Sequence, residues 1–173
     1  MEDTTTGDGP VLEPGFEDLF RTGFGPLVRA LTAASGDREV AADCVADAFE
    51  RAYARWWRIS RYDEPLAWVR RVALNRLRDH ERRRGRGVRA VARLDADPVD
   101  APAEPAGFDA LEVLGSLPRQ QRTAAALFYV EGLSVREVAS AMRLSEGAVK
   151  FHLHRAREVL RPLLGVAVSE EET

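Results

Sequence analysis

Residues 134–160 read SVREVASAMRLSEGAVKFHLHRAREVL, and this stretch decides the fold because it contains two helix starts separated by a short break. Ser134 followed by Glu137 has the spacing of a capping box, which predicts a short helix. A three-residue turn follows, and Ser145 is then a predicted cap for a longer helix. A short helix, a tight turn and a longer helix have the layout of a helix-turn-helix.

The longer helix is amphipathic. At 100° per residue its apolar side chains share one sector, and the opposite sector holds Lys150, Phe151, His154 and Arg155. Cations beside an aromatic suit a recognition helix, because Lys and Arg meet guanine edges or phosphates and Phe touches a thymine methyl. The alternative is an ordinary helical hairpin with a solvated outer face. An exposed Phe151 among bases argues against that alternative.

The rest of the chain also has helical periodicity. Apolar residues recur at i, i+3 and i+4 through 16–31, 40–56 and 66–77, with Asp37 as a predicted cap and Pro65 as a predicted helix start. Before the helix-turn-helix we expect about two helical turns from Phe108 and a helix from Pro118 to about Glu131. Pro162 can end the last helix before Leu164. No segment alternates like a strand, so the predicted fold class is all-α.

The chain divides into two small helical modules joined by a flexible linker. Pro98, Pro102 and Pro105 prevent a regular helix in the linker, and its like charges extend it. The predicted parts are an acidic disordered tail at 1–14, a helical module at 15–86, an acidic linker at 87–107, a helix-turn-helix module at 108–165 and an acidic tail at 166–173.

Composition limits the class of protein. The chain has 173 residues, a net charge of −3 and a single cysteine, Cys44. One cysteine excludes an internal disulfide and a multi-cysteine zinc site, and its place among apolar residues predicts a buried structural thiol. The apolar runs are too short for a membrane span, and the N-terminus has no signal-peptide pattern. We therefore expect a cytoplasmic protein without membrane insertion.

The charge is unevenly distributed. Residues 1–20 have a net charge of −6, residues 21–86 of +6, residues 87–118 of −4 and residues 119–173 of +1. Positive charge therefore lies on the helical modules, and the weakly acidic total does not exclude nucleic-acid binding.

The first module combines arginines with aromatic residues. Residues 70–86 contain eight arginines and two acids, and the preceding loop holds Trp57, Arg61 and Tyr62. Arginines that follow phosphates, beside aromatic rings on which bases stack, are typical of single-strand binding. Trp56 and Trp68 lie at helical spacing from other apolar residues, so at least one of them is expected in the core.

Two motifs resemble the extracytoplasmic-function sigma factors of bacterial RNA polymerase. The first is DCVADAFERAYARWW followed by PLAWVRRVALNRLRDHERRR, and the second is LPRQQR, GLSVREVA and GAVKFHLHRAR. The two motifs stand in the order and at the spacing of the family. Together with the linker between them, they cover most of residues 16–164. The matching positions of the first motif are Asp43, Asp47, Pro65, Trp68, Ala73, Asn75, Asp79, Arg82 and Arg83. The sequence departs from the pattern at Ala46, Phe151 and His152.

The resemblance implies a function for each surface. A sigma factor binds core polymerase through the clamp helices of the largest subunit and the flap of the second subunit, and it initiates transcription at promoters, here of a stress- or signal-responsive regulon. The implied polymerase-binding residues are Asp43, Asp47 and Glu50. The implied −10 element residues are Trp57, Arg61, Tyr62, Asn75, Asp79, Arg82 and Arg83. The implied −35 element residues are Ser145, Lys150, Phe151, His154 and Arg155. An anti-sigma factor is a further implied partner.

Other classes of function fit the sequence less well. A stand-alone helix-turn-helix regulator would leave the aromatic and basic first module unused, and a protein-only adaptor would not need the cationic face of the last helix. The three histidines lack metal-ligand spacing, and the chain has no Gly-rich phosphate loop. We expect no enzymatic activity, no catalytic residue, no metal and no cofactor.

Overall fold

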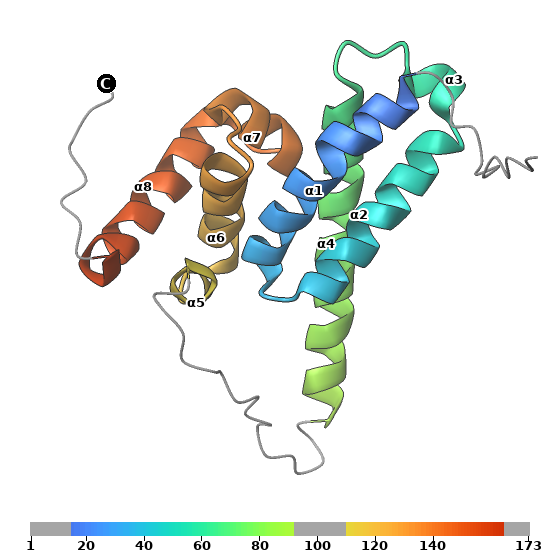
Figure 1. The fold of residues 1–173 in the computed structure, drawn as a ribbon. Helices are drawn as coiled ribbons and strands as arrows, with labels where there is room; N and C mark the ends of the chain where they lie inside the picture. The colour runs from blue at the N-terminus through green and yellow to red at the C-terminus, as the bar shows by residue number, and fades with distance from the viewer. Residues whose placement is uncertain (1–14, 92–109, 165–173) are drawn as a thin grey trace, which may run out of the picture.

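The computed structural model describes residues 15–91 and 110–164, and every regular element in these two ranges is a helix (Figure 1). This confirms the predicted all-α fold. The tails and most of the predicted linker lie outside the described residues. In chain order the elements are α1 (Phe16–Ser35), α2 (Arg38–Tyr53), α3 (Trp56–Ile59), α4 (Pro65–Val91), α5 (Ala110–Gly115), α6 (Arg119–Ala125), the π-helical turn η1 (Ala126–Val130), α7 (Val135–Met142) and α8 (Glu146–Leu164).

The first module is built on α1, α2 and α4, with the short α3 between α2 and α4. Gly36 ends α1 with a φ of +78°, a left-handed conformation that favours glycine. Asp37 caps α2 as predicted, accepting from the Val40 amide at 3.1 Å. The largest fully buried side chains of this module are Leu27, Leu31, Val45, Phe49, Ile59, Val69 and Leu74.

Helix α4 begins at Pro65, as predicted, but it ends later than predicted. It continues to Val91, five residues into the segment assigned to the linker. The first proline after Pro65 is Pro98, so no residue of 66–91 lacks the amide that the helical ladder needs. Gly85 and Gly87 weaken the helix by about 1 kcal/mol each relative to alanine, which is too little to end it.

The helix before the helix-turn-helix is not regular. The sequence predicts one helix to about Glu131, whereas α6 ends at Ala125 and passes into the π-helical η1. The Glu131 amide donates to the Ala126 carbonyl, five residues back, at 3.2 Å. Gly132 follows with a φ of +78° and stops the helix as predicted. The wide turn ends at Glu131, whose side chain is buried.

The helix-turn-helix has the predicted caps. The Glu137 amide donates to Ser134 Oγ at 3.3 Å, and the Ser134 amide donates to Glu137 Oε2 at 2.8 Å, which completes the capping box. Ser145 accepts from the Ala148 amide at 3.1 Å at the start of α8. Helix α8 continues through Pro162 to Leu164, so this proline does not shorten the helix.

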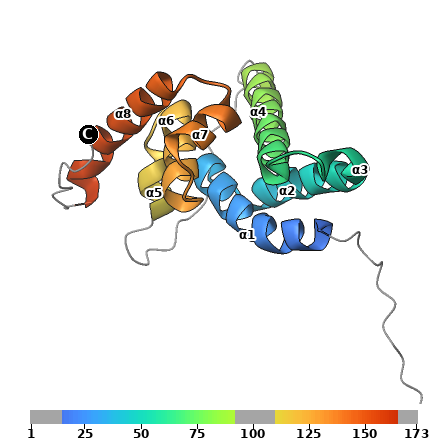
Figure 2. The same cartoon turned by 90° about the horizontal axis from the view of Figure 1, so that it is seen from above.

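The two modules pack against each other and share one hydrophobic core. Helix α1 contacts α5, α6 and η1, and α4 contacts α7. Figure 2 shows the helices of the second module gathered at one end of α1, with α3 on the opposite side of the first module. We call the surface between α1–α4 and α5–α8 the seam. The sequence predicts two modules but not this contact between them.

Candidate nucleic-acid and polymerase interfaces

The outward face of α8 carries the predicted duplex-reading residues. Lys150, Phe151, His154 and Arg155 are all exposed, and the Phe151 ring is 59% exposed. Val149, Leu153, Ala156 and Leu160 face the core from the same helix. The predicted division of α8 into two sectors is confirmed for these residues, but Val159, also predicted in the apolar sector, is 39% exposed. His152, where the sequence departs from the family pattern, is half-buried at the edge of the apolar sector.

A carboxylate accompanies two of these side chains. Arg155 Nη1 donates to Glu158 Oε2 at 2.7 Å, and His154 Nε2 lies 3.7 Å from Glu158 Oε1. Arg157 Nε donates to the Tyr129 hydroxyl at 2.7 Å and ties α8 to η1. Glu158 partly neutralises the cationic face of α8 in the free chain. The sequence motif did not single out this residue.

The loop around α3 contains both an exposed aromatic side chain and aromatic side chains packed against the core. Trp57 is 70% exposed and Arg61 is exposed. Tyr62, which the sequence also predicts as an exposed ring, is instead half-buried against the core. The Trp56 ring packs against Phe16, with ring centroids 5.4 Å apart. Trp57 is thus available for a stacked base, and Trp56 belongs to the packing of the first module.

The predicted −10 residues of α4 lie along one stretch of the helix, where Arg82 borders a cavity at the seam and Arg83 borders a cavity beside α2. Asp79, Arg82 and Arg83 are exposed, and Arg82 Nη1 lies 3.7 Å from Asp79 Oδ1. Asn75 is half-buried, and its Oδ1 accepts from Arg78 Nη1 at 3.5 Å. Arg78 was not predicted as a functional residue, although it lies one turn from both Asn75 and Arg82.

The predicted acidic face of α2 is only partly free. Asp47 accepts two hydrogen bonds from Arg76 of α4, one of them at 2.8 Å from Nη2, and it also pairs with Arg51 at 2.9 Å. The hydrogen bonds from Arg76 lower the pKa of the Asp47 carboxyl. Asp43 and Glu50 are exposed on the same helix. Asp47 therefore joins α2 to α4, and the two exposed acids remain available to a partner.

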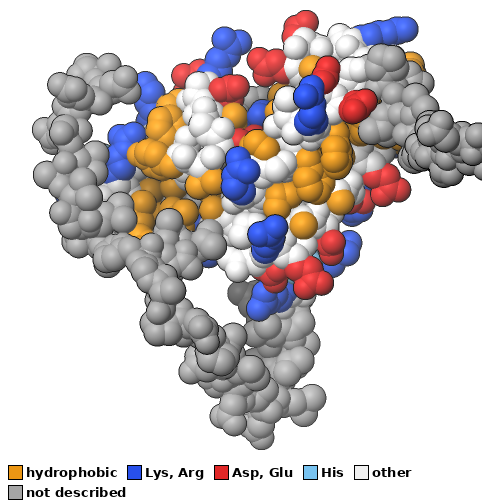
Figure 3. Space-filling model, viewed as in Figure 1, with side chains coloured by type: hydrophobic (Ala, Val, Ile, Leu, Met, Phe, Trp, Pro, Cys, Tyr) orange, Lys and Arg blue, Asp and Glu red, His pale blue; other side chains and the backbone are white. Residues whose placement is uncertain are grey.

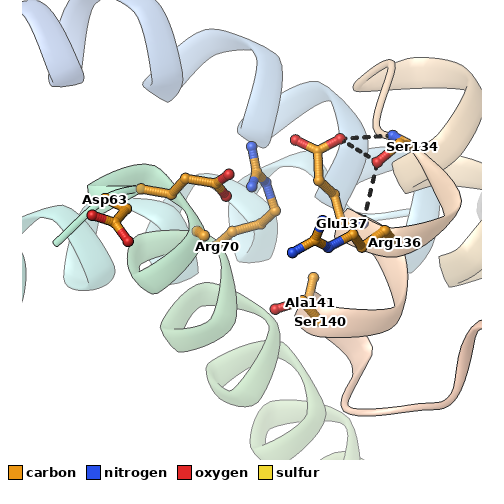
Figure 4. Close-up of a pocket in the computed structure, with 9 residues that line it drawn as sticks. Asp63, Arg70, Ser134, Arg136, Glu137, Ser140 and Ala141 are labelled. Atoms are coloured by element: carbon orange, nitrogen blue, oxygen red, sulfur yellow. Dashed lines mark hydrogen bonds between the residues drawn. The ribbon is translucent and has the colours of Figure 1, made fainter.

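A buried ion pair crosses the seam. Arg70 Nε of α4 donates to Glu131 Oε1 at 2.7 Å, and the two side chains are 8% and 4% exposed. Burial raises the pKa of Glu131, and the neighbouring Arg70 opposes that shift. Arg70 also borders a polar cavity of about 460 Å³ between the start of α4 and α7. Figure 4 shows its side chain reaching toward the Ser134–Glu137 capping box.

Further polar contacts hold the seam beside this pair. Arg78 Nη2 donates to the Met142 carbonyl at 3.1 Å, and Arg119 Nε pairs with Glu81 Oε2 at 2.6 Å. Sequence motifs could not find these contacts, because each joins residues that are far apart in the chain, and a motif does not indicate which distant residue a side chain contacts.

The described residues also include a buried thiol and exposed apolar side chains. Cys44 is buried as predicted, and desolvation by burial raises the pKa of its thiol. Within 15–91 and 110–164, no group of three His, Cys, Asp or Glu side chains is placed to hold a metal. In these ranges, no helix combines the length and apolar character that crossing a membrane requires. Figure 3 shows hydrophobic side chains on the face that includes α1, where Phe20 is 40% exposed.

Comparisons with known proteins agree with this geometry. The family model for sigma-70 region 4 matches residues 108–160. The RNA polymerase sigma-E factor of Streptomyces coelicolor is 34% identical over 155 residues, covering 88% of this chain and 86% of that protein. The ECF RNA polymerase sigma factor SigE of Mycolicibacterium smegmatis is 29% identical over 181 residues, covering 95% of this chain and 67% of that protein.

A solved structure has the same arrangement of helices. The sigma factor RpoE of Bartonella quintana, in complex with the anti-sigma factor NepR, superposes with a TM-score of 0.72 at 25% identity. The match covers 88% of this chain and 98% of that one. The chain belongs to the extracytoplasmic-function family of RNA polymerase sigma factors, and its helix-turn-helix module is sigma-70 region 4.

Proposed function

We propose that this sigma factor binds core RNA polymerase, recognises the −10 and −35 elements of promoters and catalyses no reaction itself. The observation that carries the proposal is the outward face of α8, where Lys150, Phe151, His154 and Arg155 are exposed together. A helix with cations and an aromatic on its free face suits the major groove of the −35 element. Ser145 and the amides at the start of α8 then meet a phosphate.

The first module supports a different mode of binding. Trp57 offers an exposed ring beside Arg61, and Arg82 and Arg83 lie exposed farther along α4. Stacking on the ring captures an unstacked base of the −10 element, while the arginines, roughly 25 Å along α4 from its start, hold the backbone several nucleotides away. Tyr62, Asn75 and Asp79 line the approach to that base in this proposal.

The proposed polymerase surface is the exposed part of α2. Asp43 and Glu50 present carboxylates to the clamp helices of the largest subunit, and Asp47 supports them by joining α2 to α4. Opposite charge favours the encounter with a basic partner. The helix-turn-helix module would bind the flap of the second subunit. An anti-sigma factor is a further proposed partner, because the matched Bartonella structure is such a complex.

Transcription with purified core polymerase tests the proposal. The chain should start transcripts at a defined site, and Lys150→Ala or Arg155→Ala should reduce them at least tenfold while binding to core polymerase persists. Asp43→Arg combined with Glu50→Arg should release the chain from core polymerase. A chain that binds promoter duplex but gives no transcript with core polymerase would be a stand-alone regulator, and the proposal would then be wrong.

A further inference from the structure

Three arginines converge where α4 faces the second module, and a fourth lies close enough to repel one of them. Arg78 and Arg82 lie one turn apart on α4, Arg119 is the first residue of α6, and Arg143 is the C-cap that follows α7. Arg78, Arg82 and Arg119 border one cavity of about 300 Å³ at the seam. The other lining residues are Gln120, Thr123, Met142 and Leu144. The cavity therefore has cationic walls contributed by both modules.

Two of these arginines pair with acids in the described part of the chain. Arg119 pairs with Glu81 at 2.6 Å, and Arg82 lies 3.7 Å from Asp79. Arg78 donates to the Met142 carbonyl and the Asn75 side-chain oxygen, both of which are neutral acceptors. The partly buried guanidinium of Arg78 is thus hydrogen-bonded without an opposite charge in these contacts.

The surroundings of Arg78 disfavour its charged form. Burial lowers the pKa of Arg78, and repulsion from Arg119, Arg143 and Arg82 lowers it further, against a smaller opposing effect of Glu81. Like charges held together in a partly desolvated cavity are unfavourable unless an anion joins them. Guanidinium groups match phosphate in particular, because their planar donors bind two oxygens at once.

We propose that this cavity binds a small anion carrying a phosphate or pyrophosphate group. Its volume lies at the lower end of small-molecule sites, about 300–1,000 Å³, so it admits a phosphorylated small molecule. Its walls come from α4 on one side and from α6 and the α7–α8 turn on the other. The anion therefore binds the closed seam better than separated modules, and it stabilises the closed arrangement by that difference in affinity.

Pyrophosphate is the probe, and the experiment uses the full chain without polymerase or promoter, so its outcome is independent of the proposed transcription function. Calorimetric titration and thermal unfolding are measured in pyrophosphate and in sodium chloride of equal ionic strength. Pyrophosphate should bind and should raise the unfolding midpoint more than chloride does. Arg119→Gln should weaken pyrophosphate binding about tenfold, since it removes a charged donor from the lining, and Arg143→Asn, which removes a charge near the cavity but outside its lining, should weaken it less. Asparagine is chosen because it tolerates the left-handed backbone at position 143, where φ is +58°.

Two further variants separate binding from folding. Glu81→Gln removes an acid that opposes the anion, so it should tighten pyrophosphate binding, a gain that a merely unstable variant would not show. Arg21→Gln removes an exposed arginine paired with Asp18 on α1, away from the cavity lining, and should leave binding unchanged. The proposal fails if chloride reproduces the effect or if Arg21→Gln weakens binding as much as Arg119→Gln. It also fails if a short random oligonucleotide binds more tightly than pyrophosphate and loses as much affinity in Arg119→Gln, because Arg119 lies outside the residues proposed for the −10 element and the site would then belong to a nucleic-acid backbone.

Discussion

Arg70 and Glu131 form an ion pair across the seam, joining α4 to the end of η1 through a 2.7 Å hydrogen bond. Both side chains are more than nine-tenths buried. A buried pair adds little net stability, since each ion loses its hydration, but either ion alone is strongly unfavourable. The closed arrangement therefore depends on the presence of both partners together.

Removing one partner tests this dependence. Arg70→Met leaves the Glu131 carboxylate buried without a cation, so it should lower the free energy of unfolding by about 3–5 kcal/mol. Arg70→Met combined with Glu131→Leu should recover most of that loss. Urea unfolding followed by circular dichroism measures both. Losses that simply add in the double variant would show that the two side chains do not interact in solution.

The ion pair between Asp47 and Arg76 makes stability depend on pH. The pKa of Asp47 is lowered in the folded chain, so its contribution is complete above the unfolded value of about 3.9 and is lost as the pH falls through the folded value. Asp47→Asn should lower the free energy of unfolding by about 1 kcal/mol at pH 7, because the pair is partly exposed. The difference between the variant and the wild type should disappear in acid. Asp43→Asn is the control, and an equal pH-dependent loss in that variant would contradict the assignment.

Glu158 should weaken DNA binding by the free chain. It pairs with Arg155 and lies beside His154 on the outward face of α8. Glu158→Gln should tighten binding to a duplex carrying the −35 element by roughly threefold to tenfold, because it frees cations and removes repulsion from phosphates. Fluorescence anisotropy at fixed salt measures the affinity. Glu17→Gln changes the net charge equally on α1, and a similar gain in that variant would mean that only total charge matters.

The neighbouring tryptophans should respond differently to substitution. Trp57→Ala should leave the unfolding midpoint unchanged and reduce promoter opening, measured by permanganate reactivity of unpaired thymines. Trp56→Ala should lower the free energy of unfolding by about 2–4 kcal/mol, because its ring packs against Phe16. Equal loss of closed-complex binding and opening in Trp57→Ala would argue against base capture by this ring.

Local signals in the sequence predicted most of the helices. The capping box at Ser134, the cap at Asp37 and the start at Pro65 depend on neighbouring residues, and the structure has all three. The exposed face of α8 follows from helical periodicity alone. The end of α4 lies later than the sequence predicted. Two glycines and a linker-like composition suggested an earlier end, but they weaken a helix too little to stop it, and this stretch contains no proline.

Long-range contacts could not be predicted in the same way. Asp47 matches a sequence motif, but only the structure shows that its carboxylate is bound by Arg76 and Arg51. Arg70 and Glu131 are 61 residues apart, and the motif that contains Arg70 does not indicate its partner. The η1 turn that ends at Glu131 is a local irregularity that helical periodicity does not detect.

Because the two modules share one core, opening the seam lowers the solubility of the chain. Helix α1 is covered by α5, α6 and η1, so separating the modules brings apolar surface on both sides into contact with water. Contiguous exposed apolar surface favours self-association. Opening without a partner at hand therefore carries a risk of aggregation, and a partner that captures the separated modules also acts as their chaperone.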